Sequence, residues 1–169
     1  MKLIKILALT ACTLFFTMSH AAEIVPLKNT LAPITSKEIV VTINGSNSQQ
    51  SLTLADIEKL PLQQTTLKTP WGMQGTFQGV LLKDLLNAYH LNLNKRVIFK
   101  ALDNYVAGIS KGEIERSPAF IATRFNGAAI PLSNKGPLIL LWPARDTLAA
   151  QNQTPQSSWT WSIAEISVE

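Results

Sequence analysis

Cysteine and histidine are almost absent from this chain of 169 residues. It contains one cysteine, Cys12, and two histidines, His20 and His90. Cys12 and His20 both lie near the amino terminus, so residues 22–169 offer no disulfide, no thiolate nucleophile and no thiolate metal ligand. A single histidine also cannot form a histidine cluster. These absences exclude cysteine catalysis and a conventional zinc site from residues 22–169.

Charge and long apolar runs are scarce as well. Charged residues make up 15% of the chain, and the formal net charge is +4. The lysines are scattered and form no basic stripe, so the sequence does not favour a nucleic-acid partner. Beyond the first 21 residues, no apolar run is long enough to span a membrane as a helix.

The first 21 residues have the pattern of a secretory signal peptide. Lys2 and Lys5 give a positive start, residues 6–18 are apolar, and Ser19 and Ala21 provide small side chains two positions apart. The pattern predicts cleavage after Ala21, which leaves 13 Lys+Arg against 11 Asp+Glu and a net charge of +2. It predicts an exported protein, periplasmic in a Gram-negative cell.

The same segment has an alternative interpretation as a lipoprotein signal. Residues 9–12, Leu-Thr-Ala-Cys, resemble a lipobox, in which Cys12 becomes the first residue of the mature chain. That interpretation leaves a very short apolar region before the cysteine, so we favour cleavage after Ala21.

The remaining length fits a single domain. Residues 22–37 contain Pro26 and Pro33, show no clear periodicity and are expected to form an N-terminal arm. Residues 38–169 then make up the domain itself.

Hydrophobic periodicity predicts mostly strands in that domain. Ile39, Val41 and Ile43 alternate along the first strand, which begins at Glu38. Further extended segments are predicted at residues 51–53, 62–69, 96–102, 119–125, 128–130 and 138–142. Residues 71–79, with three glycines, indicate a bent strand or a loop over the core. Asn126-Gly127 between two extended segments is a strong hairpin signal.

The final segment is predicted to be a strand with an irregularity. Trp159, Trp161 and Ile163 share one face, and the apolar positions then shift to Ile166 and Val168. A β-bulge near residues 164–165 would account for this shift. Residues 149–158, rich in Gln, Asn and Ser, are expected to be a loop.

Few helices are expected. Thr53 stands three residues before Asp56, a capping-box pattern that predicts a short helix over residues 54–60, ended by Pro61. The clearest helix has an apolar stripe of five residues: Leu81, Leu82, Leu85, Leu86 and Tyr89. Residues 112–117 indicate a helical turn or a loop. The predicted class is α+β, with a mainly β core built as a mixed sheet or barrel.

The sequence gives little support for hydrolytic catalysis. His90 lies on the polar side of the clearest helix, and no G-x-S-x-G motif is present, so a surface histidine is favoured over a general base. Glu113 and Glu115 stand beside Arg116, where a solvated charged turn is favoured over an acid–base pair.

Five segments in order carry a resemblance to a known family. They are Leu52–Pro61, Gly75–Leu86, Ala101–Tyr105, Ile121–Arg124 and Lys135–Leu138. In this order they resemble small stand-alone members of the sulfite-oxidase-type molybdopterin-binding domain family, over about residues 38–169. The resemblance implies an α+β domain with a mainly β core.

One departure from the family pattern bears on function. Enzymes of that family hold molybdenum through a cysteine thiolate, and residues 22–169 contain none. The short exported members that this chain resembles include PruR-type periplasmic pterin-binding regulators. That resemblance implies binding of a pterin without molybdenum, and action on the periplasmic domain of a membrane-bound cyclic-di-GMP synthase/phosphodiesterase.

Two alternatives remain open at this point. The chain could be a molybdopterin-dependent oxidoreductase, or a subunit of one, with a metal site that uses no thiolate. It could also be an interaction protein that retains the fold and has lost the ligand.

A pterin is a flat bicycle with N–H donors beside a carbonyl acceptor, so its site needs an aromatic face, an acceptor and a donor. Asp103 could accept from the amino edge, and Arg124 could donate to the carbonyl. Lys135, at the start of Lys135-Gly136-Pro137, could orient the ligand. The side chains that could stack on the ring are Trp71, Tyr105, Trp142, Trp159 and Trp161.

Each candidate also has a structural explanation. Asp103 and Asn104 could be turn residues that end a strand, and Lys135 could belong to a turn that leads into a strand. The tryptophans could be core residues. An arginine is unusual in an otherwise apolar strand, so for Arg124 a functional role is favoured over a structural one. A protein partner is expected to contact the pocket rim, residues 149–158 and the Trp159–Trp161 segment.

Overall fold

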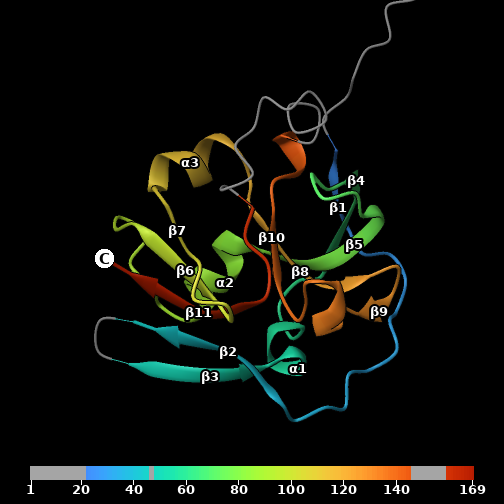
Figure 1. Cartoon of the computed structure of the whole chain (residues 1–169), viewed down its shortest axis with the longest axis horizontal. Coiled ribbons are helices and arrows are strands. Elements are labelled where there is room, and N and C mark those ends of the chain that lie inside the picture. Colours follow the sequence, from blue (N-terminus) through green and yellow to red (C-terminus); the bar gives the residue numbers. More distant parts are fainter. Residues whose placement is uncertain (1–21, 46–47, 146–158) are drawn as a thin grey trace, which may run out of the picture.

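The computed structural model describes residues 22–45, 48–145 and 159–169, which form two β-sheets with short helices around them (Figure 1). The predicted fold class is confirmed: the structure is mainly β with few helices. No helix among the described residues is long and apolar enough to cross a membrane.

The first sheet is antiparallel throughout. Its strand order is β1 (Ile24–Pro26), β4 (Gln63–Lys68), β5 (Gln74–Leu81), β8 (Phe120–Phe125) and β10 (Ile139–Leu141). β9 (Ala128–Ala129) pairs with β8 across the hairpin turn at Asn126-Gly127, as the sequence predicts.

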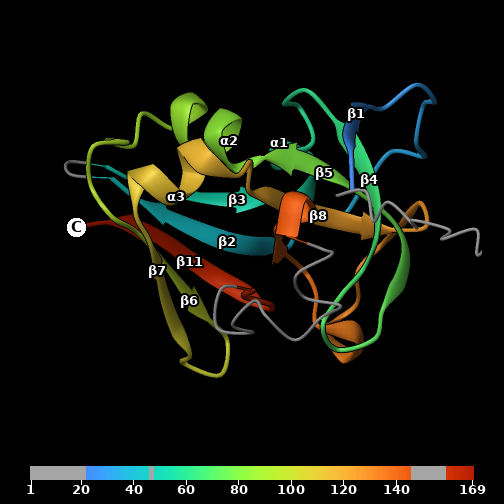
Figure 2. The same ribbon diagram turned by 90° about the horizontal axis from the view of Figure 1, so that it is seen from above.

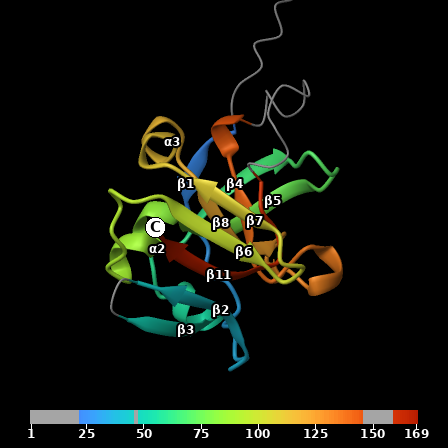
Figure 3. The ribbon, with the colours of Figure 1, turned by 60° about the vertical axis from the view of Figure 1, so that its left-hand side comes forward.

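The second sheet is mixed, and Figure 3 shows its strands side by side. Its order is β3 (Gln49–Thr53), β2 (Ile39–Asn44), β11 (Ile163–Val168), β6 (Val97–Ala101) and β7 (Val106–Ile109). β11 runs parallel to β2 and antiparallel to β6. The register of β11 against β6 shifts between Ile163 and Glu165, which confirms the predicted bulge.

Short helices connect the strands. They are α1 (Leu54–Ile57), α2 (Leu82–Ala88), α3 (Lys111–Arg116) and the 3₁₀ turns η1 (Leu132–Asn134) and η2 (Pro143–Arg145). The predicted capping box of α1 is present, because Asp56 N donates to Thr53 Oγ1 at 3.1 Å and Thr53 N donates to Asp56 Oδ2 at 3.1 Å. His90 follows α2 and is exposed.

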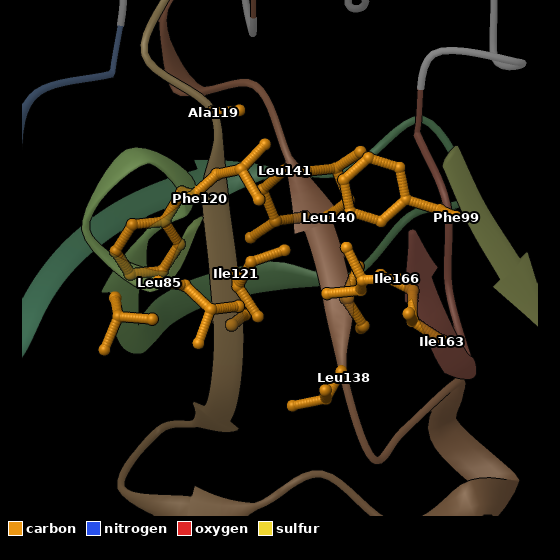
Figure 4. Close-up of a cluster of buried hydrophobic side chains, with 14 of the residues drawn as sticks. Leu85, Phe99, Ala119, Phe120, Ile121, Leu138, Leu140, Leu141, Ile163 and Ile166 are labelled. Atoms are coloured by element: carbon orange, nitrogen blue, oxygen red, sulfur yellow. The ribbon is translucent and has the colours of Figure 1, made fainter. Parts of the chain in front are cut away.

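The two sheets share one hydrophobic core. Figure 4 shows Phe120 and Ile121 of β8 and Leu140 of β10 near Phe99 and Ile166 of the second sheet. All five side chains are fully buried. The sheets are also joined along the backbone where the chain approaches β11, since Leu140 N donates to Thr160 O at 2.7 Å and Ile163 N donates to Leu138 O at 3.2 Å.

The structure adds two strands that the sequence did not predict and corrects two boundaries. Within the expected arm, β1 pairs with β4. α1 ends at Ile57, earlier than expected, because the chain continues to Leu60 in turns. β7 was not predicted. Trp159 and Trp161 precede the last strand and do not belong to it, because Ser162 adopts a positive φ of 50° and β11 begins at Ile163.

Candidate functional site

Three tryptophans from distant parts of the sequence meet at one place. The ring centroids of Trp71 and Trp161 are 5.1 Å apart, and those of Trp71 and Trp159 are 6.0 Å apart, both edge to face. The ammonium Nζ of Lys135 lies 4.0 Å from the centroid of Trp161 and 5.7 Å from that of Trp71. We call Trp71, Trp159, Trp161 and Lys135 the tryptophan cluster.

A tight loop between β4 and β5 presents Trp71. Thr69 N donates to Met73 O at 2.8 Å, and Met73 N donates to the Thr69 hydroxyl at 2.9 Å. Gly72 N donates to Thr69 O at 3.0 Å, and Gly72 has a φ of 94°, which glycine adopts at little cost. These bonds fix the loop, so Trp71 is held against the other two rings.

The turn after η1 positions Lys135. Lys135 caps η1 in the left-handed region, with a φ of 68°, and its N–H donates to Leu132 O. A Cβ on the next residue, Gly136, would lie 1.9 Å from Ile130 O, so only glycine fits there. Lys135 O accepts from Ser162 N at 2.9 Å, and this bond ties the turn to the segment that carries Trp161.

The β6–β7 turn carries three further predicted residues and adjoins the same segment. Leu102 N donates to Ser162 O at 2.9 Å. Within the turn, Asp103 Oδ1 accepts from Tyr105 N at 3.0 Å, and Asn104 has a φ of 67°. Asp103 and Asn104 therefore serve as turn residues. Figure 2 shows this turn, η1 and the β4–β5 loop along the same side of the molecule.

Three polar atoms in or beside the tryptophan cluster have no hydrogen-bond partner. They are the indole Nε1 atoms of Trp71 and Trp159 and the hydroxyl of Thr160, all buried and unpartnered among the described residues. Leaving a buried N–H unsatisfied costs about 1–3 kcal/mol. The Lys135 ammonium and the half-buried rings of Trp71 and Trp161 are groups that can contact an aromatic ring with hydrogen-bond acceptors, and the two indole donors lie buried behind them.

Arg124 lies elsewhere and has protein partners. Its Nη2 donates to Glu58 Oε2 at 2.6 Å, its Nε donates to Glu58 Oε1 at 2.8 Å, and its Nη1 donates to Gly127 O at 3.2 Å. The hydrogen bond to Glu58 is the main reason that the pKa of Arg124 is raised. Three of the five N–H groups of the guanidinium thus donate to protein acceptors. A contact between the remaining two N–H groups and a pterin stays a prediction.

Tyr105 and Trp142 line a different hollow of about 320 Å³, together with Arg96 and Glu113. Trp142 is fully buried, and the guanidinium carbon of Arg145 lies 4.0 Å from its ring centroid. The structure therefore brings four of the nine predicted residues into one cluster, places three in the adjoining turn, and separates Arg124 and Trp142 from it.

A comparison with protein families finds one match. Residues 29–147, more than half of the chain, match the oxidoreductase molybdopterin binding domain. The chain belongs to this family. The predicted resemblance is thereby confirmed. A search of curated proteins found no match to the chain.

The family match includes part of the tryptophan cluster. Trp71 and Lys135 lie within the matched residues, whereas Trp159 and Trp161 follow them. Members of this molybdopterin-binding family bind a pterin cofactor, so an aromatic cluster with unpaired donors agrees with the ligand class of the family.

The donor set of this molybdopterin-binding domain does not fit molybdenum held by a thiolate. The described residues contain no cysteine, and no group of three or more His, Cys, Asp or Glu side chains among them could hold a metal ion. The tryptophan cluster instead offers aromatic rings and one ammonium, groups that contact an organic ring and do not ligate a metal.

Sequence reasoning missed Glu58, the partner of Arg124. A buried guanidinium requires a carboxylate partner, so the arginine in an apolar strand was the signal that such a partner exists. The pairing itself depends on the packing of the α1 region against β8, which residue spacing does not reveal. The carboxylates Glu113 and Glu115 have structural roles: Glu113 completes the capping box of α3, and Glu115 lies 3.8 Å from Lys111.

Proposed function

We propose that this domain binds a pterin ring at the tryptophan cluster and performs no redox chemistry through a thiolate-held metal. The observation that carries the proposal is the coincidence of half-buried Trp71 and Trp161 with the Lys135 ammonium and two unpaired indole donors. Family membership supplies the ligand class.

The ring would stack where Lys135 now covers Trp161. A cation–π contact at a partly exposed site contributes only about 0.5–1 kcal/mol, and the lysine side chain is flexible, so a flat aromatic ligand can displace it. The displaced ammonium then donates to a ring nitrogen or carbonyl oxygen of the pterin. Asp103, in the adjoining turn, would accept from the amino edge.

The proposal extends to export and to a partner. The signal-peptide pattern before Ala22 supports export to the periplasm, and intact-mass measurement of the protein recovered from that compartment tests cleavage after Ala21. A mass with a lipidated Cys12 at its start would instead establish the lipoprotein form.

A binding domain without chemistry needs a partner that distinguishes its free and loaded states. The partner proposed is the periplasmic domain of a membrane-bound cyclic-di-GMP synthase/phosphodiesterase, as the resemblance implies. Pull-down of such a domain, with and without pterin, tests this extension. Absence of association in both conditions would overturn it without affecting pterin binding.

Titration of residues 22–169 with pterin and with its tetrahydro form tests the core of the proposal. Stacking on indole should quench tryptophan fluorescence, and ligand at a hundred times its Kd should add about 2.7 kcal/mol to the free energy of unfolding. Lys135→Met should weaken binding by at least about tenfold, since a hydrogen bond to a charged group contributes about 1.5–3 kcal/mol. Trp161→Leu should weaken binding by about tenfold, since stacking of a base-like ring on an aromatic side chain contributes about 1–3 kcal/mol.

The matched control is Trp142→Phe, which removes an indole outside the cluster and should leave the affinity unchanged. Asp103→Ala tests the amino-edge contact, with about a tenfold loss expected. Absence of binding by both pterins, or equal affinity in Trp161→Leu and the unaltered protein, would overturn the proposal.

A second candidate is a molybdopterin-dependent oxidoreductase, or a subunit of one, with a metal site that uses no thiolate. Membership in an oxidoreductase family favours it. Dye-linked turnover by protein that carries stoichiometric molybdenum would establish this alternative in place of the first.

A further inference from the structure

We propose that an apolar hollow beside the tryptophan cluster is a docking surface for an extended, apolar segment of a partner protein that carries a lysine or arginine. The hollow has a volume of about 470 Å³ and lies between the start of β2, the β6–β7 turn and the loop from β9 to β10. Ten of its twelve lining residues are apolar, and the other two are Ser36 and Glu38.

The walls of this hollow expose large hydrophobic side chains. Ile39, Leu102 and Leu132 are 53%, 57% and 62% exposed, and all three line it. They come from β2, the β6–β7 turn and η1, so the fold brings them together from three separate segments. Clusters of exposed apolar side chains on one surface mark interaction sites, whereas single ones need no explanation.

A small polar ligand is a poor occupant of this surface. Such a site requires a few directed polar groups among its apolar walls. None of the buried unpartnered polar atoms of the described residues belongs to a residue that lines the hollow. Its apolar walls instead match the side chains of a protein segment.

The charge of the lining favours a protein over a lipid surface as the occupant of the hollow. Glu38 is the one charged residue in the lining, and its carboxylate forms no ion pair among the described residues. Attachment to anionic lipids requires lysine or arginine, which the lining lacks. A free carboxylate at an apolar surface is complementary to a cationic side chain on the occupant.

The hollow and the proposed pterin site are connected through neighbouring residues. The inference that they are coupled rests on the proposed function. Leu102 and Ser162 are hydrogen-bonded through their backbones, and Ser162 N donates to Lys135 O. Pro137, two residues after Lys135, also lines the hollow. A pterin bound at Lys135 and Trp161 would therefore lie next to the wall that the partner contacts, which lets the partner distinguish the loaded state.

Site-specific photocrosslinking in the cell that makes the protein tests the surface. A photoreactive phenylalanine in place of Leu132 in the full chain should yield one protein adduct, with the crosslinked peptide rich in apolar residues and containing Lys or Arg. The matched control position is Val106, which is 55% exposed and does not line the hollow. The adduct should be absent there.

Charge reversal then identifies the pairing. Glu38→Arg should reduce the adduct at Leu132 at least tenfold, and reversal of the partner's cation to Glu should restore it. An adduct with lipid or with a second copy, an equal adduct at Val106, or no adduct at Leu132 would overturn the docking surface. Leu132→Asp should leave the pterin-induced fluorescence quenching unchanged, so failure of docking and failure of pterin binding are separately visible.

Discussion

Arg124 and Glu58 form a buried, two-bonded ion pair across 66 residues of sequence. The two side chains are only 5% and 9% exposed, and Thr123 Oγ1 donates a further hydrogen bond to Glu58 Oε1 at 2.7 Å. The pair holds the segment after α1 against β8. A pair of this kind adds little compared with an apolar pair of the same volume, but removing one partner leaves the other charge buried and unpaired.

The first prediction follows from that asymmetry. Arg124→Leu should lower the free energy of unfolding by about 3–5 kcal/mol, measured by urea denaturation, because the Glu58 carboxylate loses its counter-ion. The double variant Arg124→Leu/Glu58→Leu should recover most of this loss. Equal losses in the single and double variants would contradict a role confined to the pair.

The double variant also settles the expected contact of Arg124 with pterin. Because this variant is expected to fold, its affinity can be compared directly with that of the unaltered domain. A loss of about tenfold would support a direct hydrogen bond to the ligand. Unchanged affinity would assign Arg124 a structural role only.

The second prediction concerns acid stability. Lys59 and Thr53, through their hydrogen bonds, hold the pKa of Asp56 well below its usual range, and Ser110 lowers the pKa of Glu113 through its backbone and side chain. A carboxyl group whose folded pKa is depressed stabilises the fold above its unfolded value and loses that contribution as the pH falls through the folded pKa.

The free energy of unfolding should therefore decline as the pH falls below about 4, the ordinary range of these carboxyl groups. Asp56→Asn/Glu113→Gln should flatten this decline when urea denaturation is compared at neutral and acid pH. Glu23→Gln, which removes an exposed carboxylate with no hydrogen bond among the described residues, is the control and should leave the slope unchanged.

Local sequence patterns predicted much of the fold because the features concerned depend on interactions between neighbouring residues. The alternation in β2, the Asn126-Gly127 hairpin, the capping box of α1 and the bulge in β11 each depend on a few neighbouring residues. The strand β7 was missed because its four residues include a glycine and become a strand only through pairing with β6. β1 likewise depends on β4.

The candidate site was predicted as a set of residue types and not as an arrangement. Trp71, Lys135 and Trp161 were all expected in a ligand site, but their convergence depends on tertiary contacts. Ser162 N donates to Lys135 O, and Trp71 reaches Trp161 through ring packing alone. Arg124 stood out in the sequence because it interrupts an apolar strand. Its partner Glu58 explains that position, and only the tertiary structure brings the two together.

The third prediction contrasts two glycines. A Cβ at Gly79 of β5 would lie 2.0 Å from Ile121 O on the neighbouring strand, so Gly79→Ala should destabilise the domain by several kcal/mol, on the order of a severe overpacking variant. Gly112→Ala, in α3, meets only the end of the Arg116 side chain at 3.2 Å and should stabilise by about 0.5–1 kcal/mol. Thermal denaturation of both variants checks the contrast. A stable Gly79→Ala domain would show that β5 and β8 can separate at this point.

The last prediction concerns molybdenum. The described residues of this molybdopterin-binding domain contain no thiolate, and they hold no group of three or more metal-ligating side chains that could replace it. The single cysteine of the chain, Cys12, lies in the segment expected to be removed on export. The resemblance implies a cysteine thiolate as metal ligand, and the scattered carboxylates and the single imidazole of the described residues do not replace that soft sulfur donor. Protein purified from the periplasm of a molybdenum-replete cell should therefore contain far less than one molybdenum per chain by elemental analysis, while the pterin titration still quenches its tryptophan fluorescence.

Stoichiometric molybdenum that survives dialysis and is lost on Lys135→Met or Trp161→Leu would place a complete cofactor at the tryptophan cluster, and the oxidoreductase alternative would then replace the binding function proposed above.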